Sequence, residues 1–361
     1  MVVDDDRPLL PWLERSLREA LNLRAAHALL LHGPDGNGQF ELALAIAQAF
    51  LCESKSESTA IAPACKRCAG CRLFIARTHP DLMFLVPDSL RESLGWPAAG
   101  AEDSGVAGAS TKSKPSKEIR VDDVRAVVAF AQGSSSRGMG KAVVIHPAQH
   151  MNVIAANALL KTLEEPPGLT RYILSSNAAG ALLPTVRSRC LAVPVALPSQ
   201  KSALAWLESE GLKDAGTMLA ATGGRPVEAL QWAQAGIDAS LWLSVPERVM
   251  QGGAEVFVDW PLARVIETLQ KLCHDSICVA VGAEPRYFSM RGLVVSRDLS
   301  RLASWAAALR ELAIHAEHPW QGTLKVESLV EQGRSALLAL DADRGPQGRN
   351  SRGLASVHFA P

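Results

Sequence analysis

Four cysteines lie close together in the sequence, at spacings that suit the binding of one metal ion. Two residues separate Cys65 from Cys68 and Cys68 from Cys71, and Cys52 precedes all three. Thiolates at this spacing can face a single ion, and a fourth thiolate completes a tetrahedron with no open position. The pattern therefore predicts a structural zinc site. Reduced loop cysteines are the alternative, and a redox pair fits less well because the third cysteine has no partner in it.

A glycine-rich turn after an apolar run has the frame of a phosphate-binding loop without its two functional residues. Gly33 and Gly38 occupy the glycine positions of G-x-x-x-x-G-K-[ST], and Gly36 lies between them. Gln39 replaces the lysine and Phe40 replaces the hydroxyl residue, so neither phosphate nor magnesium finds its usual partner. We therefore expect the glycines to turn the chain from strand to helix. Nucleotide or anion binding at the helix N-terminus stays open as the alternative.

Short apolar runs alternate with helical patterns over the first half of the chain. The expected strands lie at 28–32, 81–87, 141–147 and 171–177, and the expected helices at 12–26, 40–51, 119–132 and 152–165. This alternation predicts an α/β domain with a mainly parallel sheet over residues 1–196. The zinc module is expected at about 52–75. A Gly-, Ala- and Ser-rich stretch at about 89–117 is expected to be a flexible surface insertion.

The rest of the chain shows helical patterns and no strand pattern. "VPVALPS", near residue 196, is interpreted as a linker. A small three-helix domain is expected over residues 197–237 and a longer helical bundle over residues 238–342. Residues 343–361 are predicted to be a disordered tail.

Composition and net charge limit the classes of function that we expect for this chain. Lys plus Arg equals Asp plus Glu, at 37 each, so net charge gives no general attraction to nucleic acid. No apolar stretch approaches the roughly 20 residues that span a bilayer. The acidic N-terminus lacks the apolar core of a secretory signal, so a cytoplasmic location with no membrane partner is expected.

Two later motifs complete a recognisable order along the chain. "ANALLKTLEEPP" at 156–167 is followed about 20 residues later by "SRC" at 188–190. With the loop frame and the cysteine insertion before them, these motifs resemble the delta-prime family of bacterial DNA polymerase III clamp-loader subunits, in the AAA+ superfamily. The resemblance covers the first 200 residues well. It implies an AAA+ P-loop-type domain with a zinc-binding insertion, a helical lid at 197–237 and a helical collar at 238–342 through which subunits join.

The resemblance also implies that this subunit does not hydrolyse ATP. In the motor subunits of such a loader, the strand of the second motif ends in Asp-Glu, which supports magnesium and the attacking water. His146 and Pro147 stand at the matching positions here, and Val227 stands where the lid carries its sensor arginine, with Arg225 two positions away. These losses add to those in the glycine-rich loop. A divergent AAA+ ATPase is the alternative, and a zinc-dependent nucleic-acid-binding adaptor is a third possibility.

The "SRC" motif retains a functional residue. In the family its arginine, here Arg189, is an arginine finger that reaches the ATP of a neighbouring subunit in trans. A guanidinium suits this role because it is planar, always charged and contacts two oxygens. The expected function is thus a non-catalytic scaffold in a pentameric ring with motor subunits and a delta subunit. The ring loads a sliding clamp on primed DNA, within a complex that has DNA polymerase activity.

Other charged residues near these motifs have less definite roles. Glu164 and Glu165 close a helix, and a structural or interface role is expected for them instead of catalysis. Lys141 and Lys161 could contact DNA phosphates or the carboxylates of a partner, and the sequence does not decide between these.

Overall fold

The computed structural model describes residues 9–23, 26–54, 62–91, 94, 115–293, 298–314 and 322–338. The chain divides into two compact units, Met1–Ala215 with Gly224–Gln234 and Gly216–Gly223 with Ala235–Pro361. Residues 197–237, predicted as a lid, contribute to both units, and the domain limits at 197 and 238 remain predictions. The tail at 343–361 and most of the insertion at 89–117 lie outside the described residues.

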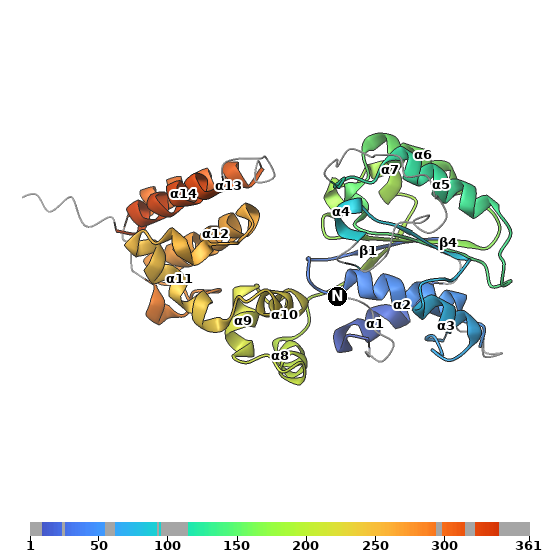
Figure 1. The fold of residues 1–361 in the computed structure, drawn as a ribbon, viewed down its shortest axis with the longest axis horizontal. Helices are drawn as coiled ribbons and strands as arrows, with labels where there is room; N and C mark the ends of the chain where they lie inside the picture. Colours follow the sequence, from blue (N-terminus) through green and yellow to red (C-terminus); the bar gives the residue numbers. More distant parts are fainter. Residues whose placement is uncertain are drawn as a thin grey trace, which may run out of the picture. The chain divides into compact units, whose positions relative to one another are not determined.

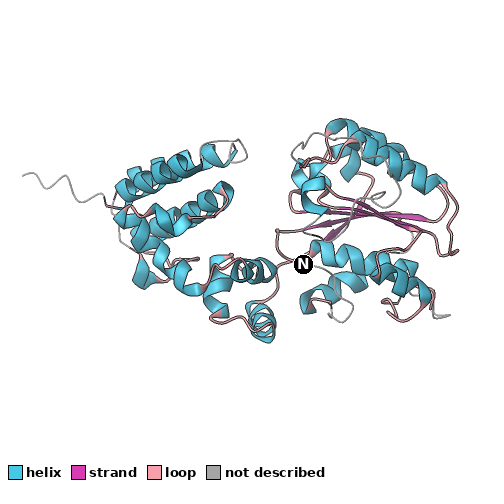
Figure 2. Ribbon diagram, viewed as in Figure 1, coloured by secondary structure: helices cyan, strands magenta, loops and turns pink. Residues whose placement is uncertain are grey.

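The first unit is built on a five-stranded parallel sheet (Figures 1 and 2). Its strands are β1 (Ala28–His32), β2 (Leu82–Leu85), β3 (Lys141–Ile145), β4 (Thr170–Ser176) and β5 (Leu191–Pro194). They lie in the order β2-β3-β4-β1-β5, and every neighbouring pair is parallel. The predicted α/β class with a parallel sheet is confirmed.

Strand β5 ends in the segment "VPVALPS", which the sequence led us to interpret as a linker. It pairs with β1, with Leu29 opposite Leu191. Its residues are apolar, but only Val193 among the four is buried. The prolines at 194 and 198 favoured the linker interpretation, because proline is depleted in strands. Pro194 is tolerated because β5 is an edge strand, which needs no hydrogen bonds on its outer side.

Helices cover both faces of the sheet (Figure 2). Leu29 and Leu31 of β1 belong to one core cluster with residues of α1 (Glu14–Asn22) and α2 (Gln39–Leu51). Ala28 and Leu30 belong to the other cluster, with residues of α5 (Val121–Gln132) and α6 (Val153–Glu164). Burial on both faces explains why β1 is a continuous apolar run.

The two edges of the sheet carry different connections. The glycine-rich loop follows β1 and His146 follows β3, so both lie at the carboxyl edge, where parallel sheets usually bind ligands. The connection from α6 into β4, and that from α7 (Pro184–Arg187) into β5, lie at the amino edge. A five-residue strand separates the edges by about 16 Å.

The described chain contains further helices, joined by loops. They are α3 (Ala69–Ile75), α4 (Asp88–Arg91), α8 (Gln200–Ser209), α9 (Ala215–Ala221), α10 (Pro226–Gln234), α11 (Ala239–Gln251), α12 (Leu262–Ala280), α13 (Leu299–Ile314) and α14 (Gly322–Leu337). Short 3-10 turns occur at Pro11–Leu13, Ala148–His150, Ala179–Ala181, Ala254–Phe257 and Met290–Gly292. In the second unit α12 packs on α13 and α14, and the buried Asp275 accepts backbone N–H groups of Arg286, Tyr287 and Phe288 at 2.7–2.9 Å.

Candidate functional site

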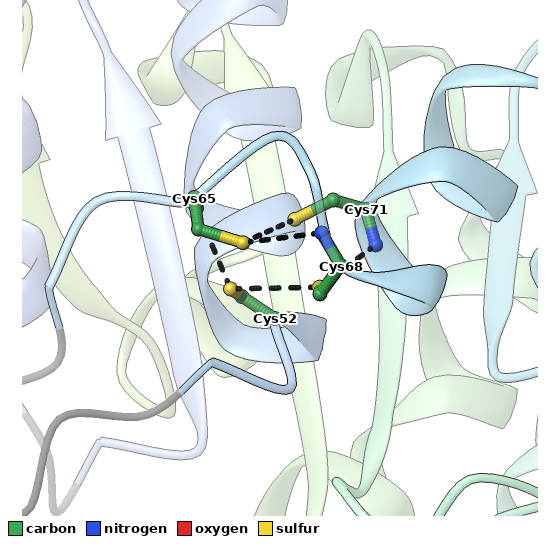
Figure 3. Close-up of side chains that lie close together, drawn as sticks. All are labelled: Cys52, Cys65, Cys68 and Cys71. Atoms are coloured by element: carbon green, nitrogen blue, oxygen red, sulfur yellow. Dashed lines mark hydrogen bonds between the residues drawn. The ribbon is translucent and has the colours of Figure 1, made fainter.

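The four predicted cysteine ligands converge in space (Figure 3). Their sulfur atoms all lie within 4.8 Å of one another, and the Cys52–Cys68 and Cys65–Cys71 sulfur pairs are each 3.9 Å apart. A tetrahedral zinc ion with Zn–S bonds near 2.3 Å requires sulfur atoms about 3.8 Å apart. The donor set and its dimensions therefore fit a four-thiolate zinc site.

Local backbone structure positions the sulfur atoms. Cys52 follows the end of α2, whereas Cys68 is the N-cap of α3 and Cys71 lies in its first turn. Backbone N–H groups point at the sulfurs: Cys65 N lies 3.4 Å from Cys52 Sγ, Cys68 N 3.4 Å from Cys65 Sγ and Cys71 N 3.3 Å from Cys68 Sγ. Such N–H groups stabilise the thiolate form that a metal requires.

The thiols differ in acidity because they differ in surroundings. Hydrogen bonds from the Ser54 side chain and from the backbone of Arg67 and Cys68 lower the pKa of Cys65 to about 5. Burial raises the pKa of Cys71. A nearby cation would be needed to hold all four groups as thiolates at neutral pH, which is the effect that zinc supplies.

An ion pair ties the cysteine module to the sheet, and sequence reasoning missed it. Glu53, next to Cys52, pairs with Arg137 in the loop before β3. The same loop is held by the fully buried Asp81, whose carboxylate accepts from Ser136 N at 2.7 Å, Arg137 N at 2.9 Å and Ser135 Oγ at 3.0 Å. The module is thereby anchored to a rigid part of the domain.

The glycines of the loop after β1 fit tight places. A Cβ at Gly33 would lie 2.1 Å from the carbonyl oxygen of Val195, so only glycine allows the loop to approach the end of β5. Gly38 is the N-cap of α2 at φ +91°, and Gly36 has φ +72°, a region that glycine adopts without strain. The close approach and the positive φ values both support a role in chain turning.

Gln39 turns back onto its own loop. Its side-chain amide donates to the carbonyl oxygen of Gly33 at 2.8 Å and to that of Pro34, and the residue is buried. The amide N–H groups are therefore occupied by the loop itself. A lysine at this position would extend a charge towards phosphate, whereas this glutamine closes the loop.

Phe40 packs where a magnesium ligand would stand. Its ring centre lies 4.7 Å from that of His146 and 6.3 Å from that of Phe84. His146 Nδ1 is 2.7 Å from Ser175 Oγ, and burial, followed by the charge of His150, lowers the pKa of His146 to about 4. The imidazole is thus neutral at physiological pH. The two altered motifs meet in one aromatic contact.

Two further residues complete the loop region. Glu41, in the first turn of α2, is half-buried, and desolvation raises its pKa while a hydrogen bond from its own backbone N–H lowers it. Asn37 is fully buried, and neither polar atom of its side chain is hydrogen-bonded within the described residues. The side chain of Glu41 thus lies at the positive end of α2, where a phosphate would otherwise bind.

The position that we predicted to match the sensor arginine is held by a valine. Val227, in α10, is a buried core residue. Arg225 forms an ion pair with Glu228 at 2.8 Å, and a Cβ at Gly36 would lie 3.3 Å from Arg225 and 3.0 Å from Glu228. Arg225 therefore lies beside the loop with its charge already paired.

Arg189 lies at the amino edge of the sheet. Its Nε donates to Glu164 Oε1 at 2.6 Å, and Nη2 forms an ion pair with the same carboxylate. Nη1 donates to the carbonyl oxygen of Thr185 at 2.8 Å and to Ser188 Oγ at 3.3 Å. The side chain remains 29% exposed. Since the glycine-rich loop lies at the carboxyl edge, the sheet separates Arg189 from the loop of its own chain.

The remaining candidates fall into two groups. Cys190 packs against the core cluster beside α6, and burial raises its pKa to about 12, so it acts as an apolar anchor beside Arg189. Lys141 is buried and donates to the carbonyl oxygen of Phe130 at 2.5 Å, at the end of α5. The amino group of Lys141 is therefore hydrogen-bonded inside its own chain. Lys161 is exposed on α6, and its partner choice stays open.

Comparison with known proteins identifies the family. The profile described as DNA polymerase III, delta subunit matches residues 11–198, more than half of the chain. The chain belongs to this family. The resemblance stated from the sequence motifs is confirmed.

Curated relatives carry the name DNA polymerase III subunit delta'. The protein of Pseudomonas aeruginosa is 37% identical over 230 residues, with 61% of this chain and 60% of the relative covered. That of Escherichia coli is 32% identical over 227 residues, with 61% and 59% covered. The chain thus matches about 60% of the length of these relatives.

One solved structure aligns with most of this chain. A DNA polymerase III gamma subunit-related protein of Thermotoga maritima aligns with 90% of this chain and 99% of its own, at 15% identity and a TM-score of 0.43. That score is too low to support an argument. Within the described residues, every helix is too short or too polar to cross a bilayer.

Proposed function

We propose that this protein is a non-catalytic subunit of a DNA polymerase III clamp loader. It takes one place in a pentameric ring with motor subunits and a delta subunit, joined through its C-terminal helices. The ring places a sliding clamp on primed DNA in the cytoplasm. Membership of the family and the names of its curated relatives support this assignment.

The observation that carries the proposal is the contrast between the two edges of the sheet. At the carboxyl edge, Gln39 closes the loop, the ring of Phe40 contacts that of His146, and Glu41 lies in the first turn of α2. At the amino edge, Arg189 is partly exposed just after the short helix α7. A chain with this arrangement does not bind and split ATP but presents a cation to the site of another chain.

Arg189 acts in trans as an arginine finger. When the neighbour's ATP loses its γ-phosphate, negative charge develops on the equatorial oxygens, and a planar guanidinium stabilises that charge through two N–H groups. Thr185 and Ser188 hold the guanidinium at Nη1, so it enters the neighbouring site in a restricted orientation. Restricted orientation reduces the entropy lost when the transition state forms.

Cys52, Cys65, Cys68 and Cys71 hold a structural zinc ion in this proposal. Bound zinc supplies a cross-link between the end of α2 and the start of α3, and it takes no part in a reaction because four thiolates leave no open position. Glu53 and Arg137 transmit this rigidity to the sheet. The module stabilises the domain and the surface beside it.

Co-assembly with the other loader subunits tests the proposal. We expect the chain to co-elute with motor and delta subunits as one complex, and the clamp- and DNA-stimulated ATPase of the mixture to rise when the chain is added. A chain that stays separate, or a mixture equally active without it, would contradict the proposed role. Salt-sensitive DNA affinity of the chain alone would favour the nucleic-acid-binding adaptor instead.

A further inference from the structure

The guanidinium of Arg189 is already engaged inside its own chain. Nε and Nη2 contact the carboxylate of Glu164, and Nη1 contacts Thr185 O and Ser188 Oγ. A guanidinium has five N–H donors, and these four contacts use all but one. A contact of two N–H groups with phosphate oxygens therefore requires Arg189 to give up at least one of its present hydrogen bonds.

We propose that Glu164 is an internal substitute for the phosphate, which the triphosphate of the neighbouring subunit must displace before Arg189 can act. This inference rests on the proposed function, because it takes Arg189 to be the arginine finger. Glu164 presents to Nε and Nη2 the kind of oxygen that the γ-phosphate presents. The carboxylate and the phosphate therefore compete for the same face of the guanidinium.

The contacts at Nη1 keep Arg189 in place while its other donors change partner. Nη1 is held by the carbonyl oxygen of Thr185, at the short helix α7, and by Ser188. These contacts do not involve Glu164 and can persist when Nε and Nη2 change partner. The guanidinium therefore needs only a small rotation to exchange the carboxylate for a phosphate.

The exposure of the pair makes the contact weak enough to exchange. The side chain of Glu164 is 48% exposed, and ion pairs exposed to this degree contribute little net stability. A γ-phosphate carries more negative charge than a carboxylate and presents more oxygens, so it competes well for the same donors.

The location of Glu164 also favours its release. It is the last residue of α6, and Glu165 follows at the C-cap. The C-terminal end of a helix carries partial negative charge, which disfavours carboxylates there. Arg189 offsets this repulsion in the free chain. When Arg189 turns to a phosphate, Glu164 is left among negative charges and can turn outward to water from its half-exposed position.

The test uses the reconstituted loader with this chain as wild type, E164Q, E165Q, R189A or the E164Q/R189A double variant. ATP turnover is measured over a range of ATP concentrations with clamp and primed DNA. Glutamine keeps the size of the Glu164 side chain but removes the charge that competes with phosphate. E165Q is the matched control, because it removes the neighbouring exposed charge on the same helix end.

We expect E164Q to raise kcat/KM about two- to fivefold, the range that corresponds to one exposed ion pair. E165Q should match the wild type, and the double variant should match R189A, because Glu164 acts only through Arg189. A kcat/KM for E164Q that equals or falls below the wild type, while R189A is impaired, overturns this inference and leaves the proposed function intact. An increase that persists in the double variant also overturns it. Normal activity of R189A would overturn both.

Discussion

Replacing Arg189 with alanine should lower ATP hydrolysis about 10³-fold or more at the site of the neighbouring subunit that we propose it completes, while the loader still assembles. This is the range reported for arginine fingers that stabilise charge on a transferring phosphoryl group. The total ATP turnover of the ring should fall by the fraction that this site contributes. It should fall further if other sites are coupled to it. Single-turnover kinetics with labelled ATP would separate the slow site from the others.

Two variants make this experiment specific. R189K keeps the positive charge but loses the planar pair of donors, so we expect it to remain strongly impaired. R125A is the matched control, because Arg125 is an exposed arginine on α5 that forms a surface ion pair with Asp122. R125A should hydrolyse ATP as the wild type does. An R189A loader with wild-type single-turnover rates at every site would remove Arg189 from its proposed role.

The second large effect is expected on removal of the metal. Metal analysis should find about one zinc ion per chain in the purified wild-type protein. The C68S variant should contain far less zinc. Zinc binding by four-cysteine and related small domains is strongly coupled to folding, with apparent free energies of about 10–16 kcal/mol in peptides. We therefore expect loss of protection from proteolysis and hydrogen exchange at residues 62–75 in C68S, and the same result in wild-type protein treated with a chelator.

The control for the metal experiment is another cysteine of the same chain. Cys278, in α12, lies outside the four-thiolate cluster, so C278S should keep one zinc ion and wild-type protection. Protein that is free of zinc and yet protected at residues 62–75 would show that the cysteines act as reduced core residues. Zinc retained in full by C68S would exclude Cys68 from the ligand set.

The sequence predicted those parts of the fold that have a local signal. The ends of β1, β3 and β4 were predicted to within about two residues because buried parallel strands read as apolar runs between turns. Strand β5 was missed because its apolar run contains Pro194 and continues to Pro198, and prolines are more typical of a linker than of a strand. Its place beside β1 depends on tertiary pairing that no short window of sequence records.

The candidate site was predictable where spacing alone fixes geometry, as with the four cysteines. The contacts that join distant segments were not. The sequence could show that Gln39 replaces the lysine of the motif. The hydrogen bond from Gln39 to Gly33 and the ring contact between Phe40 and His146 are visible only in the fold. The Asp81 network was missed for the same reason, since its donors lie more than 50 residues away in sequence.

The central claim is that this chain holds no working ATPase of its own and provides a cation to its neighbour. ATP turnover by the purified chain alone, measured with magnesium and compared with its Q39A variant, tests this most directly. We predict no phosphate release above the buffer background in either protein. Turnover by the chain alone that is abolished in Q39A would contradict the claim and establish a divergent ATPase in its place.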